Sequence, residues 1–137
     1  MYIIGETETS EGTLVEFNRN VTTAALTYNT CFKDGHDGVD GLDYATSVTV
    51  SPDNMNVYVS GFVGTDEAIA IFNRDASTGS LTYNACFKDG LNEFNASSVT
   101  VSPDNKNVYI TNKNLYPEGG GVVILDRNLL TGCRRRS

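Results

Sequence analysis

The sequence has no tryptophan, a single histidine and no long apolar run among its 137 residues. A membrane-spanning helix needs about 20 consecutive apolar residues, so we expect no membrane span. No stretch places apolar residues at the spacing of three to four that marks an amphipathic helix, so we expect no long helix. The first ten residues contain neither a basic segment nor a sustained apolar segment, and no signal peptide is visible.

Positive charge is also scarce. The chain carries 10 lysines and arginines against 17 aspartates and glutamates, which gives a formal net charge of −7. Nucleic-acid binding needs a basic surface, so the charge argues against a nucleic-acid partner. One basic cluster, at residues 134–136, lies close to the C-terminus, and a short terminal run of this kind is typical of a solvated tail.

The three cysteines do not make a disulfide framework. Cys31 and Cys86 lie in the related segments TYNTCFKDG and TYNACFKDG, and Cys133 has no counterpart. Equivalent positions in neighbouring repeats are expected to lie farther apart than the roughly 7 Å between Cα atoms that a disulfide allows. We therefore expect two half-buried thiols and one exposed thiol near the tail, and the cysteines do not fix the redox compartment.

The chain has instead an internal repeat with a period of about 50 residues, which is typical of stacked or radial folds. SVTVSPDNM at residues 47–55 returns as SVTVSPDNK at 98–106, and EFNRNVTTAALTYNTCFKDG at 16–35 returns as IFNRDASTGSLTYNACFKDG at 71–90. A third, shorter copy, ILDRNLLTG, occupies residues 124–132.

Each full repeat predicts four short strands in meander order. The Ser-Pro-Asp-Asn segment favours a tight turn between strands at 48–50 and 57–59. Residues 68–72 are apolar on both alternations, which predicts burial on both faces. Residues 81–87 alternate, with Leu81, Tyr83, Ala85 and Phe87 on a drier face, which is typical of an outermost strand. The innermost strands are then expected to hold Val48, Val50, Val99 and Val101.

These features predict an all-β fold of β-propeller blades, each a four-stranded antiparallel meander, in an incomplete ring. A parallel solenoid would need shorter rungs, and a sandwich would not repeat its sequence. Residues 1–46 are expected to hold the second to fourth strands of a partial blade and a connecting loop. Residues 47–97 are expected to form a complete blade, and residues 98–137 the first to third strands of another, with the basic tail.

The segments SPDN(K/M)NVY(V/I) and (A/V)(I/V)xxFNRDxxTGxLTY resemble the bacterial seven-bladed propellers of the lactonase-like, YVTN-repeat family. The resemblance covers nearly all of the chain, in about two and a half blades, and the Trp-Asp marks of WD repeats are absent. Asn54 and Asn105 stand where the family commonly has glycine. Asparagine is the next-best residue for a left-handed backbone, so the turn is expected to survive.

This resemblance implies a ring of seven blades and roughly 350 residues. An open arc would leave two exposed edges and two uncovered apolar faces. We therefore expect further blades of the same repeat as partners, either covalently continuous in a longer polypeptide, which we favour, or contributed by identical subunits.

One loop carries a candidate metal site. Asp34, Asp37, Asp40 and Asp43 alternate with glycines in DGHDGVDGLD. Carboxylates spaced by flexible backbone can surround Ca²⁺, which takes six to eight oxygen ligands, although the spacing is not that of an EF-hand. The alternative, which we favour, is a solvated acidic loop without a cofactor, because the second copy at 89–93 has largely lost the pattern.

Other polar residues give little sign of catalysis. His36, flanked by Asp34 and Asp37, could act as a general base, but no serine or cysteine nucleophile accompanies it. Three arginines recur at the end of the third strand, which favours a structural ion pair or turn contact over catalysis; they are Arg19, Arg74 and Arg127.

Two functions follow as hypotheses. The first is a non-catalytic propeller segment that serves as a binding or structural scaffold, with a slight preference for an extracellular or cell-surface protein. The alternative, implied by the resemblance, is part of a lactonase-type hydrolase similar to 6-phosphogluconolactonase. The sequence does not identify a ligand.

Overall fold

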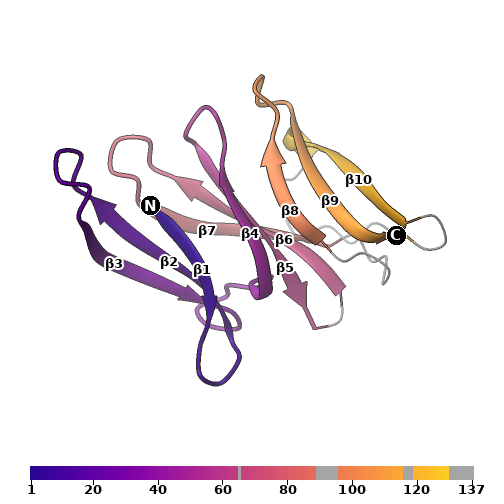
Figure 1. Ribbon diagram of the computed structural model, residues 1–137, viewed down its shortest axis with the longest axis horizontal. Helices are drawn as coiled ribbons and strands as arrows, with labels where there is room; N and C mark the ends of the chain where they lie inside the picture. Colours follow the sequence, from indigo (N-terminus) through magenta and orange to yellow (C-terminus); the bar gives the residue numbers. More distant parts are fainter. Residues whose placement is uncertain (65, 89–95, 116–118, 130–137) are drawn as a thin grey trace.

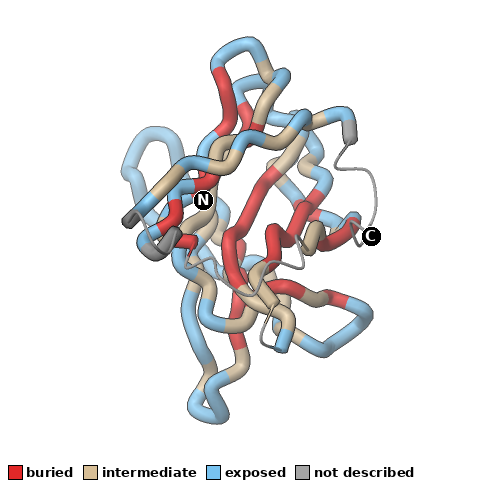
Figure 2. Tube along the Cα trace, turned by 90° about the vertical axis from the view of Figure 1, so that its right-hand side faces the viewer, coloured by how far each residue is buried: buried red, intermediate tan, exposed pale blue. Residues whose placement is uncertain are grey.

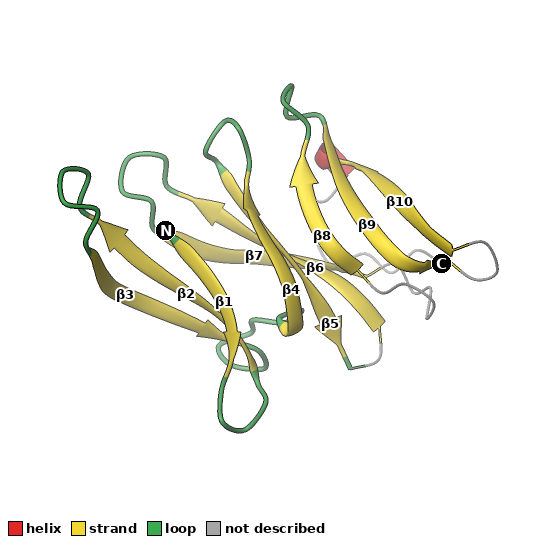
Figure 3. Cartoon of the chain, viewed as in Figure 1, coloured by secondary structure: helices red, strands yellow, loops and turns green. Residues whose placement is uncertain are grey.

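The computed structural model describes residues 1–64, 66–88, 96–115 and 119–129, and within them the chain forms ten strands and one short 3₁₀ helix (Figures 1 and 3). The strands are β1 (Tyr2–Glu6), β2 (Gly12–Arg19), β3 (Leu26–Lys33), β4 (Asp43–Val50), β5 (Asn56–Val63), β6 (Asp66–Arg74), β7 (Leu81–Lys88), β8 (Ala96–Val101), β9 (Asn107–Leu115) and β10 (Gly119–Asp126), followed by the helix η1 (Arg127–Leu129).

The strands make three antiparallel sheets. The N-terminal sheet has the order β1-β2-β3, the central sheet β4-β5-β6-β7 and the C-terminal sheet β10-β9-β8. Each strand pairs with its neighbour in sequence, so every sheet is a meander, and Figure 1 shows the N-terminal and C-terminal sheets at opposite ends of the molecule. The predicted all-β architecture of open, meandering sheets is confirmed, whereas the residue boundaries between repeats stay a prediction.

One edge strand of each sheet lies beside an edge strand of the next. β4 packs beside both β8 and β1, while β7 forms the opposite edge of the central sheet. The valines expected on innermost strands occupy β4 (Val48, Val50) and β8 (Val99, Val101). The sheets therefore stack face to face like adjoining blades.

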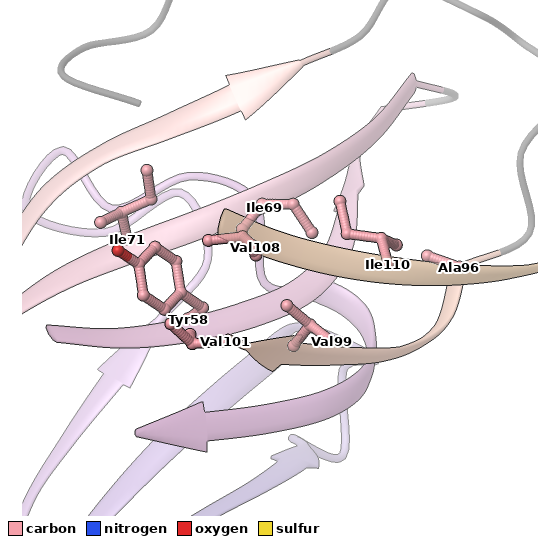
Figure 4. Close-up of a cluster of buried hydrophobic side chains, with 8 residues drawn as sticks. All are labelled: Tyr58, Ile69, Ile71, Ala96, Val99, Val101, Val108 and Ile110. Atoms are coloured by element: carbon pink, nitrogen blue, oxygen red, sulfur yellow. The ribbon is translucent and has the colours of Figure 1, made fainter. Parts of the chain in front are cut away.

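Two apolar interfaces hold the sheets together, and Figure 2 shows the buried segments running through the middle of the molecule. The side chains between the N-terminal and central sheets include Leu14, Val57, Val59, Ala70 and Phe72. Those between the central and C-terminal sheets are Tyr58, Ile69, Ile71, Ala96, Val99, Val101, Val108 and Ile110 (Figure 4). β6 thus has both faces buried, as its unbroken apolar run predicts.

The Ser-Pro-Asp-Asn turn is built by its own side chains. Ser51 Oγ donates to Asp53 Oδ1 at 2.6 Å, and the backbone N–H of Met55 donates to the same oxygen at 3.0 Å. Asn56 N–H donates to Ser51 Oγ at 3.0 Å. Asn54 has φ 61°, the left-handed conformation that asparagine tolerates. These contacts explain why the repeat keeps this sequence.

The remaining sequence predictions concern the cysteines, the C-terminal tail, the second copy of the acidic loop and a membrane span. Cys31 and Cys86 are free thiols; Cys31 is half-buried as expected, whereas Cys86 is buried. Cys133, the tail at 134–136 and the second loop at 89–93 lie outside the described residues. In the described part of the chain, no helix is long and apolar enough to span the membrane.

Candidate functional site

The most extensive polar site joins the C-terminal sheet to the central sheet through Arg127, which directly follows β10. Its Nη1 donates to Asp53 Oδ2 at 2.6 Å, its Nη2 donates to Asn56 Oδ1 at 2.6 Å, and its Nε donates to Tyr58 Oη at 2.9 Å. Ser51 Oγ lies 3.4 Å from Nη2. We call the four receiving residues the first arginine pocket: Ser51, Asp53, Asn56 and Tyr58.

The first arginine pocket is electrostatically matched to a guanidinium. The hydrogen bond from Arg127 lowers the pKa of Asp53 to about 2, so the carboxylate stays charged at neutral pH. The side chains of Arg127 and Asp53 are only 13% and 29% exposed. Burial raises the pKa of Tyr58, which keeps its hydroxyl protonated. A planar, always charged arginine fits such a set of acceptors better than lysine would.

Arg74 makes the corresponding contact one sheet earlier. Its Nε donates to Tyr2 Oη at 2.8 Å, and its Nη1 donates to the Asn54 carbonyl at 3.1 Å. Tyr2 occupies the position in the N-terminal sheet that Tyr58 occupies in the central sheet, and its hydroxyl also bonds to the Gly79 carbonyl. The structural contact predicted for the recurring arginines is therefore present at both Arg74 and Arg127.

The acidic loop places its aspartates in different surroundings. Asp34 Oδ1 accepts the Leu42 N–H at 2.7 Å, and Asp43 Oδ1 accepts the Gly12 N–H at 3.3 Å. Asp40 Oδ2 lies 3.5 Å from Lys88 Nζ. Asp37 has φ 52° and is exposed.

The acidic loop packs between the N-terminal and central sheets. Val39 and Leu42 are 5% and 0% exposed and belong to the core between these sheets. Gly41, with φ 94°, lies so close to Ala68 and Cys86 that an added Cβ would stand 3.3 Å from each of their Cβ atoms. The loop therefore contributes to packing through its apolar residues and its glycine.

A cation site in this loop stays a prediction. Burial raises the pKa of Asp34, and the nearby negative charges of Asp43 and Asp40 raise it further. In the ranges that the structure describes, no group of three or more His, Cys, Asp or Glu side chains is arranged to hold a metal ion. The contacts favour a structural role for Asp34, Asp40 and Asp43.

An open cleft of about 600 Å³ lies between the outer strands β3 and β7. His36, Lys33 and Tyr83 line it, and Tyr83 Oη donates to the Asp40 carbonyl at 3.2 Å. His36 Nε2 is 3.4 Å from Glu11 Oε1, so its partner is not either of the flanking aspartates. Sequence reasoning missed this cleft because its walls come from two different repeats.

No protein-family model matches the chain, and no curated protein matches it. Several solved structures have a similar fold, and two of them carry a provisional assignment as 6-phosphogluconolactonases. The Bacteroides fragilis protein has a TM-score of 0.59 and 14% identity over 93% of this chain. The Bacteroides uniformis protein has a TM-score of 0.57 and 15% identity over 92% of this chain.

The fold is that of a partial β-propeller. The chain spans 37% of the length of each of these two structures. At such low identity the likeness concerns the fold, in which the three sheets are consecutive blades. The arginine contacts therefore lie between neighbouring propeller blades.

Proposed function

We propose that the chain is a non-catalytic segment of a larger β-propeller assembly, in which it serves as a structural and binding scaffold. The observation that carries this proposal is the use of the repeated polar residues. Arg74 and Arg127 both tie one blade to the next through a tyrosine. Residues that recur in each blade and are occupied by contacts between blades favour stacking over chemistry.

The second argument comes from the end faces, the outward faces of the N-terminal and C-terminal sheets. Val122 and Ile124 are 59% and 62% exposed on β10, and Tyr28 is 60% exposed on β3. Covering a large apolar side chain stabilises by about 1.5–3 kcal/mol, and clustered exposed apolar residues mark interaction sites. The partners in this proposal are further blades of the same repeat, in the same polypeptide or in identical subunits. The cell surface is the proposed location, which surface biotinylation of the source cells would test.

The alternative function is a lactonase-type hydrolase. It is favoured by the fold likeness to two proteins assigned that activity and by the cleft that His36 and Lys33 line. The distinguishing experiment follows loss of 6-phosphogluconolactone in the presence of the purified chain. The scaffold proposal predicts the uncatalysed rate. Turnover above that rate, removed by His36→Gln but not by Thr9→Ala at an exposed turn, would replace it with the hydrolase.

A further inference from the structure

The C-terminal sheet covers one face of the central sheet. The outward face of the C-terminal sheet carries similar residues at the aligned positions. Three positions of the central sheet, each 2% exposed, pack against the C-terminal sheet. Their counterparts lie on the C-terminal sheet; Val122 and Ile124 are exposed there and Tyr109 is half-buried. The aligned pairs are Tyr58 with Tyr109, Ile69 with Val122 and Ile71 with Ile124.

The C-terminal sheet also carries a second arginine pocket, formed by Ser102, Asp104, Asn107 and Tyr109 at the positions of Ser51, Asp53, Asn56 and Tyr58. Its turn has the same geometry: Ser102 Oγ donates to Asp104 Oδ1 at 2.6 Å, and Lys106 N–H donates to the same oxygen at 3.1 Å. Asp104 Oδ2 faces solvent, 3.8 Å from Lys106 Nζ, and the carboxylate is 57% exposed. The serine and the aspartate of the first pocket thus have the same arrangement in the second.

The opposite end of the molecule presents the matching donor. Arg19 ends β2 at the position that Arg74 and Arg127 hold in the later repeats, and it is exposed. Among the described residues, no hydrogen bond or ion pair reaches its guanidinium.

Apolar groups flank this arginine as they do in the internal interface. Phe17 and Tyr28 make an edge-to-face pair with centroids 6.3 Å apart, as Phe72 and Tyr83 do at 5.5 Å. Ile3 is 41% exposed on the same sheet, at the position where Val59 is fully buried. The N-terminal sheet therefore resembles, in charge and in shape, the face that covers an arginine pocket.

We propose that a second copy of this chain docks its N-terminal sheet on the C-terminal sheet of the first and inserts Arg19 into the second arginine pocket. This inference rests on the proposed function, because it takes further blades to be what covers the end faces. The two sheets lie at opposite ends of the molecule (Figure 1), so this docking is a head-to-tail contact. Such a contact adds further copies until the geometry closes a ring.

The test is sedimentation velocity on the full chain and on two variants, Arg19→Gln and Asp104→Asn. Asp104→Asn keeps an oxygen for the Ser102 hydroxyl and the Lys106 N–H, so the turn is retained. Each variant should weaken self-association by about tenfold or more, since it removes one partner of the charge pair. An equimolar mixture should form dimers and no larger species, because each mixed pair has one intact interface.

Asp75→Asn is the matched control. Asp75 accepts a hydrogen bond from Ser77 Oγ at 2.5 Å, the same kind of turn contact, but on a different turn. Its substitution changes the net charge by the same amount as Asp104→Asn. Melting temperatures of all variants verify folding. Unchanged association in Arg19→Gln or Asp104→Asn, an equal loss in Asp75→Asn, or a mixture without dimers would overturn the docking geometry and leave the scaffold proposal standing. A stable wild-type monomer would overturn both.

Discussion

At the scale of single residues, the ion pair between Asp53 and Arg127 gives the fold a defined acid sensitivity. The pKa of Asp53 is depressed to about 2 in the folded chain, against about 3.9 in an unfolded chain. A group with a depressed folded pKa contributes stability above its unfolded pKa, and this contribution disappears as the pH falls through its folded pKa. The contact between the central and C-terminal sheets should therefore weaken between about pH 4 and pH 2.

Asp53→Asn should reproduce this loss at neutral pH. It removes the charge that meets Arg127 Nη1 at 2.6 Å, and we expect the free energy of unfolding to fall by about 1–2 kcal/mol at pH 7. Denaturant unfolding of both proteins from pH 2 to pH 7 measures the difference, which should vanish near pH 2. Glu8→Gln, which removes one negative charge from an exposed turn, is the control. A difference that is constant with pH would refute this role for Asp53.

Gly12 illustrates a second constraint at single-residue scale. A Cβ at this position would lie 1.7 Å from the Leu42 carbonyl oxygen, so Gly12→Ala must move the acidic loop away from the N-terminal sheet. We expect a loss of about 2 kcal/mol or more in unfolding free energy. Gly5→Ala, whose added Cβ would meet only Thr13 Oγ1 at an ordinary 3.5 Å, is the control. Equal effects in both variants would show that the close approach does not matter.

Calcium titration tests the remaining interpretation of the acidic loop. Because Asp34, Asp40 and Asp43 already contact the chain, we expect millimolar Ca²⁺ to leave the melting temperature unchanged. A ligand that binds only the folded state raises stability by mass action. A rise that Asp37→Asn abolishes would establish the calcium site instead.

At the scale of the strands, equivalent positions in successive repeats differ only in what covers them. Ile71 is buried between the central and C-terminal sheets, while Ile124, at the same position of the next repeat, is 62% exposed. Ile71→Ala should cost about 2–4 kcal/mol in unfolding free energy. Ile124→Ala should cost much less in a monomer. Thermal and denaturant unfolding at low protein concentration checks both, and similar losses would mean that the two faces are equally buried.

Local signals in the sequence predicted the strands and the Ser-Pro-Asp-Asn turns well, because alternation and turn chemistry act between near neighbours. The outer strand β7 shows where this fails. Thr82 and Asn84 are exposed as the alternation predicts, but Cys86 is only 2% exposed. The acidic loop from the previous repeat covers it through Gly41, and no pattern within the strand reports that contact.

The arginine site was predictable only in part. Recurrence of Arg74 and Arg127 indicated a structural role, but their partners lie 72 and 69 residues away, on the preceding sheet. That pairing depends on how two sheets stack, which local patterns do not encode. Glu16, which takes the position of Ile71 in the repeat, also has a partner on another sheet: its buried carboxylate accepts the Leu81 N–H at 3.3 Å.

At the scale of the whole molecule, three stacked sheets have two internal interfaces and two end faces. The internal interfaces combine an apolar core with an arginine contact, and the outward faces of the two end sheets carry the same elements, with no neighbouring sheet among the described residues. A domain typically has a net stability of about 5–15 kcal/mol. Leaving several apolar side chains exposed forgoes about 1.5–3 kcal/mol each, a sum comparable to that stability. We therefore expect that the chain does not persist as an isolated monomer.

Light scattering on the purified 137-residue chain, over a series of concentrations, tests this central claim most directly. The account predicts a mass that exceeds 14.8 kDa and rises with concentration as the end faces associate. A monodisperse species of 14.8 kDa that melts cooperatively across the series would contradict it.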